Sequence, residues 1–169
     1  MPLPRLLTPE DAAAYLAIRL EMLGESPWAF LSSPEEPGNT VEVVAQRLSQ
    51  SENEILGVFG AEGGLLSVAG VYRSDRAKTR HKAHVWGVYT TPGARGQGFG
   101  HTVVQSAVGV ARSWAGVEVI SLSCSARATA ALAMYRDLGF EIWGTEPDAM
   151  RVGGESAEEV HMAFIPGEG

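Results

Sequence analysis

The stretch Val88-Tyr89-Thr90-Thr91-Pro92-Gly93-Ala94-Arg95-Gly96-Gln97-Gly98-Phe99-Gly100-His101 decides the fold of this chain. It predicts a strand, a glycine-rich turn and an amphipathic helix in direct succession. Glycines at every second position, 96, 98 and 100, free the backbone so that successive N–H groups can converge on one anion. The N-terminus of the helix adds the positive end of its dipole. The stretch therefore predicts a phosphate-binding loop.

Other interpretations of these glycines are weaker. They could merely permit a tight strand-to-helix connection. A P-loop would need Gly-Lys-Ser/Thr at its end, which is absent from this stretch. A dinucleotide fingerprint would need a third glycine where His101 stands, and Glu118, at the distance of its ribose acid, lies at the start of the next predicted strand.

Composition limits the possible classes of function. The 169 residues, 45% of them hydrophobic, suffice for one compact domain. A net charge of -7 and a pI near 5.1 disfavour nucleic acid or an anionic membrane as partner. Cys124 is the single cysteine, and neither a signal peptide nor a membrane-length apolar run is evident, so we expect a cytoplasmic protein.

The N-terminal third predicts two helices and a loop. Thr8, Pro9 and two acids begin a helix that should end at Gly24, with Ala12, Leu16, Leu20 and Leu23 on its inward face. Trp28 and Phe30 in the following loop should pack on the core, or alternatively form a wall of a substrate pocket. Asn39 and Glu42 suggest a capping box for a helix to about Gln50.

The remainder alternates strands with helices. A glycine turn joins strands 54–61 and 65–73 into a hairpin, and the basic residues from Arg73 to Lys82 should form a solvated turn. Gly87 predicts a bulge in the central strand 84–89. Helix 98–115 should bury Val104, Val108 and Ala111. Further segments are predicted as strand 118–124, helix 129–138, a strand starting at 140–143 and strand 159–165, which together indicate an α/β fold with a mixed sheet.

Two motifs in this order resemble the GCN5-related N-acetyltransferase (GNAT) family. Arg95-Gly96-Gln97-Gly98-Phe99-Gly100 is similar to the family's pyrophosphate-binding loop, and Met134-Tyr135-x-x-Leu138-Gly139-Phe140-Glu141 is similar to its second signature. The resemblance implies a single-domain, mostly antiparallel mixed sheet flanked by helices, with a splayed central strand pair. It further implies one N-acetyltransferase domain over 1–169, with an acetyl-CoA-binding core at about 54–147 and acceptor-side helices and loop at about 8–50.

The resemblance also implies where acetyl-CoA binds. Main-chain groups of Val88 and Thr90 would hold the pantetheine arm, and a backbone N–H near Val88 would face the thioester oxygen. The full set of expected cofactor-binding residues is Val88, Tyr89, Thr90, Arg95, Gly96, Gln97, Gly98, Phe99, Gly100 and His101. Ala128 replaces the asparagine that the family commonly has, and Arg127 offers a compensating cation or is simply a surface residue.

The catalytic expectations rest partly on the same resemblance. Tyr135 is the candidate general acid for the CoA thiolate, against the alternative of a core tyrosine. His84 is the leading candidate base; Glu54 and His161 are weaker, and a water chain is equally compatible. Cys124 is chemically possible as an acyl-carrying nucleophile but is more typical of a small buried residue. The histidines have no ligand-like spacing with it, so we expect no catalytic metal.

Together these features predict direct acetyl transfer from acetyl-CoA to a primary amine of a small molecule or peptide. The alternatives are a non-catalytic acyl-CoA-binding module and a Rossmann-type nucleotide-binding protein. We expect no nucleic-acid or membrane partner, and a homodimer is conceivable. The resemblance does not identify the amine.

Overall fold

A mixed seven-stranded sheet with helices on both faces forms the protein, whose computed structural model describes residues 1–167. The sheet order is β1-β2-β3-β4-β5-β7-β6. The strands are β1 (Arg5–Leu6), β2 (Asn53–Phe59), β3 (Leu65–Arg73), β4 (Lys82–Thr90), β5 (Val119–Ser125), β6 (Glu141–Val152) and β7 (Glu155–Phe164). The helices are α1 (Ala12–Glu25), α2 (Val41–Leu48), α3 (Phe99–Ser113) and α4 (Thr129–Asp137). No helix within residues 1–167 has the length and apolarity to cross a bilayer.

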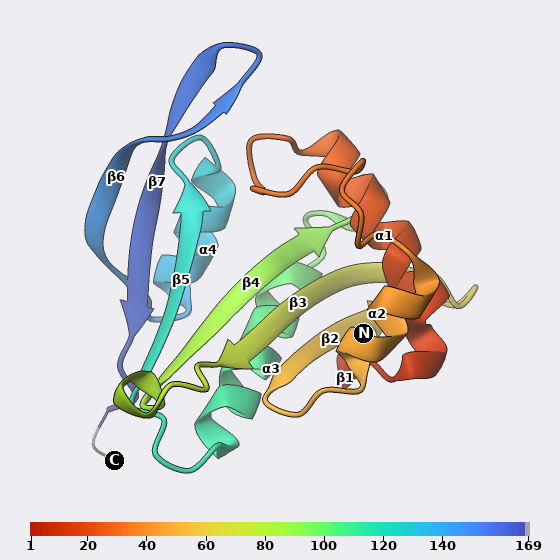
Figure 1. Cartoon of the computed structure of the whole chain (residues 1–169), viewed down its shortest axis with the longest axis horizontal. Helices are drawn as coiled ribbons and strands as arrows, with labels where there is room; N and C mark the ends of the chain where they lie inside the picture. The colour runs from red at the N-terminus through yellow and green to blue at the C-terminus, as the bar shows by residue number, and fades with distance from the viewer. Residues whose placement is uncertain (168–169) are drawn as a thin grey trace.

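The centre of the sheet is split. Neighbouring strands are antiparallel except β4 and β5, which pair in parallel only through residues 82–84 and 119–121. Beyond these pairs the two strands diverge, as Figure 1 shows. The single-domain α/β fold, its mixed sheet and its splayed central pair are therefore confirmed.

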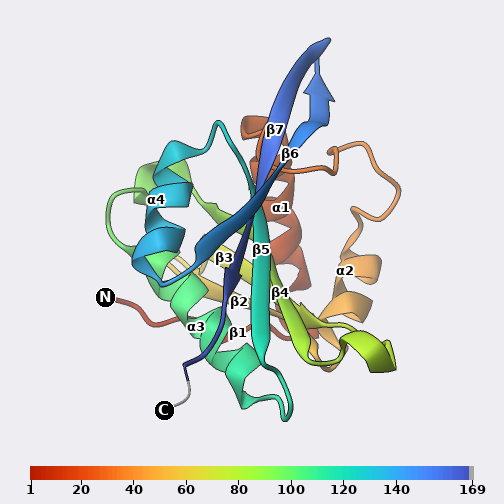
Figure 2. The same ribbon diagram turned by 90° about the vertical axis from the view of Figure 1, so that its left-hand side faces the viewer.

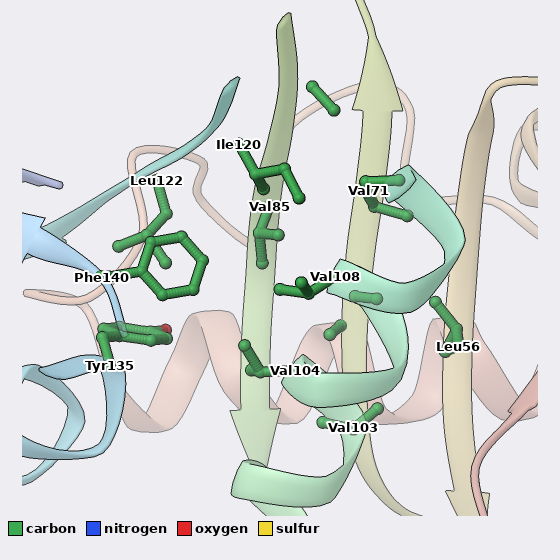
Figure 3. Close-up of a cluster of buried hydrophobic side chains, with 14 of the residues drawn as sticks. Leu56, Val71, Val85, Val103, Val104, Val108, Ile120, Leu122, Tyr135 and Phe140 are labelled. Atoms are coloured by element: carbon green, nitrogen blue, oxygen red, sulfur yellow. The ribbon is translucent and has the colours of Figure 1, made fainter. Parts of the chain in front are cut away.

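Each face of the sheet has its own core. Figures 1 and 2 show α3 and α4 on one face and α1 and α2 on the other. Side chains of α3 and α4 pack with alternate residues of β2 to β5 in the first cluster (Figure 3), and those of α1 and α2 pack with Ile55, Val68 and Tyr89 in the second. The inward positions predicted for α3, 104, 108 and 111, are confirmed.

The inward face predicted for α1 is confirmed at Ala12 and Leu23 and wrong at Leu20, with Leu16 half-buried. Tyr15, Ile18, Arg19 and Met22 are buried, whereas Leu20 is 38% exposed. The helix carries apolar residues all round, so their spacing alone fits more than one face. The capping box at Asn39 is also wrong, because Thr40 caps α2 by accepting a hydrogen bond from the Val43 N–H at 3.3 Å. Strand β1 and the length of the β6–β7 hairpin were not predicted.

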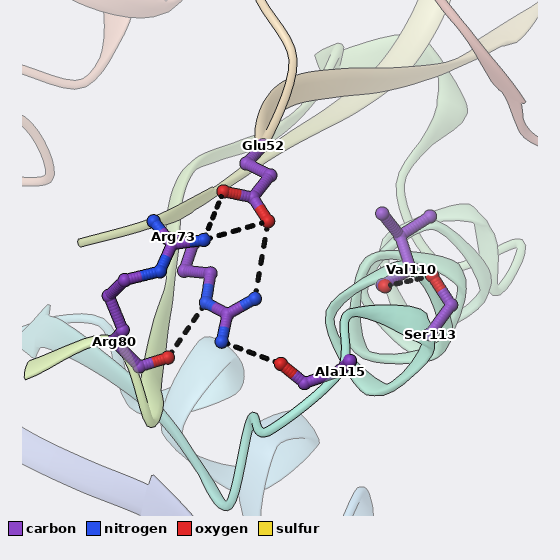
Figure 4. Close-up of polar contacts among 6 residues, drawn as sticks. All are labelled: Glu52, Arg73, Arg80, Val110, Ser113 and Ala115. Atoms are coloured by element: carbon purple, nitrogen blue, oxygen red, sulfur yellow. Dashed lines mark hydrogen bonds and ion pairs between the residues drawn. The ribbon is translucent and has the colours of Figure 1, made fainter. Parts of the chain in front are cut away.

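The basic connection between β3 and β4 is not simply a solvated turn. The Arg73 side chain is only 8% exposed and donates to the carbonyls of Arg80 at 2.7 Å and Ala115 at 2.6 Å (Figure 4). It also pairs with Glu52 at 3.2 Å, which Arg80 contacts at 2.8 Å. Arg73 thus ties the end of β3 to the connections that enter β4 and β5, at the closed end of the splayed pair.

Candidate active site

A β-bulge lies in β4 where β4 and β5 separate. The β3–β4 register passes from Val68 opposite Tyr89 to Gly70 opposite Trp86, so Gly87 and Val88 face one residue of β3. Gly87 has φ +58°, a conformation that favours glycine. The bulge predicted from Gly87 is confirmed. It leaves backbone groups near Val88 outside the regular ladder, where an oxygen of a bound ligand could accept from them.

The glycine-rich loop follows β4 directly and opens into α3. Gly96 and Gly98 have φ of +75° and +83°, and Gly98 is the N-cap residue of α3. No side chain within residues 1–167 caps this helix, so its first N–H groups lack an acceptor in the helix and in the cap. Gly96, Gln97 and Gly98 are exposed, and His101 is exposed on the first turn. This geometry suits an anion such as a pyrophosphate.

Gly100 lies where the end of β4 meets α4. A Cβ built there would lie 3.3 Å from Thr90 Oγ1 and 3.4 Å from Met134 Sδ. The residue is half-buried between these two elements. The loop, Thr90 and the second motif are therefore brought to one place.

Three of the expected cofactor-binding residues use their side chains elsewhere. Arg95 pairs with Glu25 at 2.8 Å, and this contact lowers the pKa of Glu25 to about 2. The Tyr89 hydroxyl donates to Glu21 at 3.0 Å and to Glu25 at 3.2 Å; burial, then these acids, raise the Tyr89 pKa. Phe99 is buried in the core. For these three only the main chain remains a candidate ligand.

Tyr135 of α4 projects beneath the splayed strands. Its ring packs edge-to-face on Phe140 at 6.1 Å, and Figure 3 shows its hydroxyl directed from α4 toward β4. Within residues 1–167 the hydroxyl has no hydrogen-bond partner, and only Trp86 Nε1 is both fully enclosed and unpartnered. Tyr135 as a whole is 5% exposed. Burial raises its pKa, with a smaller contribution from Cys124, so the phenol is protonated at neutral pH.

His84 lies on the opposite face of the sheet from Tyr135. Its Nδ1 lies 2.5 Å from Ser121 Oγ and its ring stacks on Tyr72 at 4.9 Å. Burial, and secondarily Lys82, lower its pKa, so the imidazole is neutral at pH 7 and can accept a proton. His161 lines the same cavity and contacts Glu146 at 3.1 Å, whereas Glu54 does not line it.

Two adjoining cavities open on the α1/α2 face. The first, about 350 Å³, contains His84 and Ser121; the second, about 570 Å³, contains Gly87 and Phe30. They share Tyr72, Val85, Trp86 and Ser123. Phe30 packs on Tyr89 at 6.3 Å, as predicted for a core residue, and also lines the second cavity; its role as a wall of a substrate pocket stays a prediction. Trp28 instead stacks under the Arg127 guanidinium at 3.7 Å.

The remaining candidates contribute less to this site. Burial raises the pKa of Cys124 to about 11, which leaves its thiol protonated and weakly nucleophilic. Arg127 pairs with Glu155 at 3.3 Å. Ligand atoms of Glu146, Glu159 and His161 lie within 4.8 Å of one another, a spacing that could hold a metal ion, but they are exposed or half-buried groups of a kind common without one. Absence of a catalytic metal stays a prediction.

Comparisons with known proteins agree with this geometry. Residues 20–140 match the Acetyltransferase (GNAT) family. No curated protein sequence matches the chain. Among solved structures, it is similar to a GNAT-family acetyltransferase from Streptococcus pneumoniae (TM-score 0.88, 19% identity, 98% of this chain and 100% of that chain). It is also similar to ribosomal-protein-alanine N-acetyltransferase from Brucella melitensis (0.82, 24%, 97% and 99%) and to a phosphinothricin acetyltransferase from Sinorhizobium meliloti in complex with acetyl-CoA (0.84, 20%, 99% and 90%).

The glycine loop and the splayed strands belong to a fold that matches solved acetyltransferase structures, and the family match extends over most of the chain. The protein therefore belongs to the GNAT acetyltransferase family. It is an acyltransferase, and acetyl-CoA is its cosubstrate.

Sequence reasoning missed Arg19, Arg47 and Trp86, which line the second cavity. They come from α1, α2 and β4, so only the tertiary structure brings them together. One signal was available: Arg19 stands four residues after Tyr15 and three before Met22, on the face that is in fact buried.

Proposed function

We propose that the protein transfers the acetyl group of acetyl-CoA to a primary amine of a small molecule or peptide by direct attack. The observation that carries the proposal is the junction of the Gly87 bulge with the exposed glycine loop at the N-terminus of α3. The bulge would provide backbone donors for the thioester oxygen, and the loop would provide them for the pyrophosphate.

The two reactants would approach from opposite faces of the sheet. The glycine loop and Tyr135 belong to α3 and α4 on one face, and the cavities with His84 and Gly87 open on the other. The gap between β4 and β5 would connect them at the bulge, so the thioester could meet the amine there. This arrangement favours catalysis over a binding module, because a cavity for a second reactant adjoins the cofactor site.

The reaction needs two proton movements. The neutral amine nitrogen forms a bond to the thioester carbonyl carbon and loses one proton, while the C–S bond breaks and the sulfur gains one. Neutral His84, directly or through water, would accept the first proton. A backbone N–H near Val88 would stabilise the carbonyl oxygen as negative charge develops on it.

The Tyr135 hydroxyl would act on the departing sulfur. Its raised pKa makes it a weaker acid than a thiol, whose ordinary pKa is about 8.5. Complete proton transfer from Tyr135 to the thiolate is therefore thermodynamically unfavourable in this environment. A hydrogen bond that strengthens as charge develops on the sulfur explains the role better than full protonation.

Direct attack, without an acyl-enzyme, is tested at Cys124. We expect Cys124→Ala to retain its rate of acetyl transfer, because a thiol with a pKa of about 11 is almost entirely protonated at neutral pH. The measurement is single-turnover transfer with an amine found by a thiol-release screen, followed by mass spectrometry of the protein. An acetyl adduct on Cys124 that the amine discharges would overturn direct attack.

Three finer predictions accompany the proposal. The domain is expected to divide into an acetyl-CoA-binding core at about 54–147 and an acceptor side at about 8–50. Phe30, from the acceptor side, supports this division because it lines the cavity next to Gly87. A cytoplasmic location and a homodimer stay predictions, to be checked by fractionation and by light scattering.

A further inference from the structure

The 570 Å³ cavity beside the bulge has an excess of hydrogen-bond donors. Arg19 of α1 is only 8% exposed, and Arg47 of α2 is half-buried. Trp86 of β4 also lines the cavity, but its indole N–H is fully enclosed and lies against Gly70 of β3. Arg19 and Arg47, from two separate helices, thus place two cationic side chains at one cavity that Gly87 also lines.

The two guanidinium groups converge. Both lie close enough to the Tyr15 hydroxyl to lower its pKa against the burial that raises it. Arg47 also lies over the Trp86 ring, with its Cζ 5.9 Å from the ring centroid. Arg19 and Arg47 therefore lie close together among the residues that line the cavity.

No acid in the described chain neutralises this pair. Within residues 1–167 neither arginine forms an ion pair, although Glu159 of β7 also lines the cavity. The Arg19 Nε donates to Asn39 Oδ1 at 2.9 Å, and its guanidinium also lies against the Tyr15 hydroxyl, so its side-chain partners are neutral. A guanidinium has five N–H donors, and burying it without an anion is costly. The cavity is thus suited to a small anion.

We propose that the amine acceptor carries a carboxylate, and that Arg19 and Arg47 bind this carboxylate while the amine lies toward Gly87. Free amino acids are the chemical class that meets this requirement. Planar guanidinium groups suit a carboxylate because they can donate two parallel hydrogen bonds to it. Glu159, on another wall, would favour the ammonium form on entry. The inference rests on the proposed acetyl transfer and narrows its substrate class.

The test compares the standard amino acids with their carboxamides as acceptors, in a thiol-release assay with acetyl-CoA. The parent should prefer the acids. Arg47→Gln should lower kcat/KM for the acids roughly 10-fold to 100-fold, mainly through KM, and should lower it much less for the amides, because a neutral carboxamide loses a weaker hydrogen bond than a carboxylate does. The quantity compared is the acid-to-amide ratio, the ratio of kcat/KM for an amino acid to kcat/KM for its carboxamide. The two amines differ in basicity, but this difference is the same for parent and variant, so it does not affect the change in the ratio. Arg112→Gln, an exposed arginine of α3, is the matched control and should behave as the parent does.

A second pair of variants shows whether Arg19 binds the carboxylate or only holds the loop that contains Asn39. If Arg19 only anchors the loop through Asn39, then Asn39→Ala should reduce the acid preference as much as Arg19→Gln does. We expect Asn39→Ala to keep that preference and Arg19→Gln to lose it, with both proteins checked for folding by circular dichroism. Equal loss in the two variants would assign Arg19 to the loop and overturn its part in the inference.

The inference can fail separately from the proposed function. If acetyl-CoA binds but the parent acetylates amides or decarboxylated amines as well as acids, or if Arg47→Gln leaves the acid-to-amide ratio unchanged, the carboxylate site is wrong and acetyl transfer stands. If acetyl-CoA does not bind, the proposed function falls. In that case the carboxylate site is tested by thermal unfolding of the protein with added ligand. A higher melting temperature with the amino acids but not with their carboxamides supports the site, and equal shifts with both contradict it.

Discussion

Tyr135 is the residue at which the chemical and the structural roles can be separated. Its hydroxyl has no partner within residues 1–167, so Tyr135→Phe removes no internal hydrogen bond. We expect the melting temperature to stay within a few degrees and kcat to fall by about 10²-fold. Single-turnover transfer and thermal unfolding on the same preparation check this. Unchanged transfer with a lowered melting temperature would return Tyr135 to a purely structural role.

His84 predicts a pH dependence. Burial lowers its pKa below 6.5, so the imidazole stays neutral until the pH falls through that lowered pKa. If His84 is the base, kcat/KM should decline as the pH falls through the lowered pKa of His84. The His84→Gln variant should lose most activity, and its remaining activity should no longer show this decline at low pH. His81→Gln is the control. An unchanged decline at low pH in the His84 variant would assign the base to water or another residue.

The lowered pKa of His84 also makes the stability of the folded protein depend on pH. Because the folded state disfavours protonation of His84, its contribution to stability is present above the unfolded pKa of about 6.5 and is lost as the pH falls through the lowered folded pKa. Denaturation curves at several pH values would show this loss for the parent and a smaller one for the variant.

At the scale of elements, Arg73 holds the closed end of the splayed strands. Arg73→Met leaves two carbonyls, of Arg80 and Ala115, without their donor, so we expect a loss of roughly 2–3 kcal/mol in the free energy of unfolding. Arg76→Met, an exposed neighbour, should change it by about 0.5 kcal/mol or less. Urea denaturation measures both. Equal midpoints would show that Arg73 is dispensable.

Elements whose signals are local could be predicted from the sequence. The loop glycines, the bulge at Gly87 and the helix that carries Tyr135 each depend on a few adjacent residues, and the structure has all of them. Features set by long-range packing could not. The exposure of Leu20 and the burial of Tyr15 and Ile18 on α1 depend on what the sheet presents to that helix, and the proximity of Arg19 to Arg47 depends on how α1 and α2 pack.

For the whole molecule, the sheet is two parts joined at the centre by a short parallel ladder. Antiparallel strands β1 to β4 form one part, and β5, β7 and β6 form the other. The proposed acetyl-CoA site takes its loop from the first and Tyr135 from the helix that follows β5. A ligand that contacts both parts binds only the folded state, so acetyl-CoA should raise the free energy of unfolding by about 2.7 kcal/mol at 100 times its Kd.

The measurement that tests the central claim most directly is a calorimetric titration of acetyl-CoA into the parent, Gly100→Val and Gly109→Val. Both glycines belong to α3, but a Cβ at Gly100 meets Thr90 and Met134 where the cofactor should lie, whereas one at Gly109 meets nothing within 4 Å. We expect micromolar binding by the parent, about 8 kcal/mol, at least roughly tenfold weaker binding by Gly100→Val, and parental binding by Gly109→Val. A folded Gly100→Val protein that binds acetyl-CoA as the parent does would contradict the placement of the cofactor.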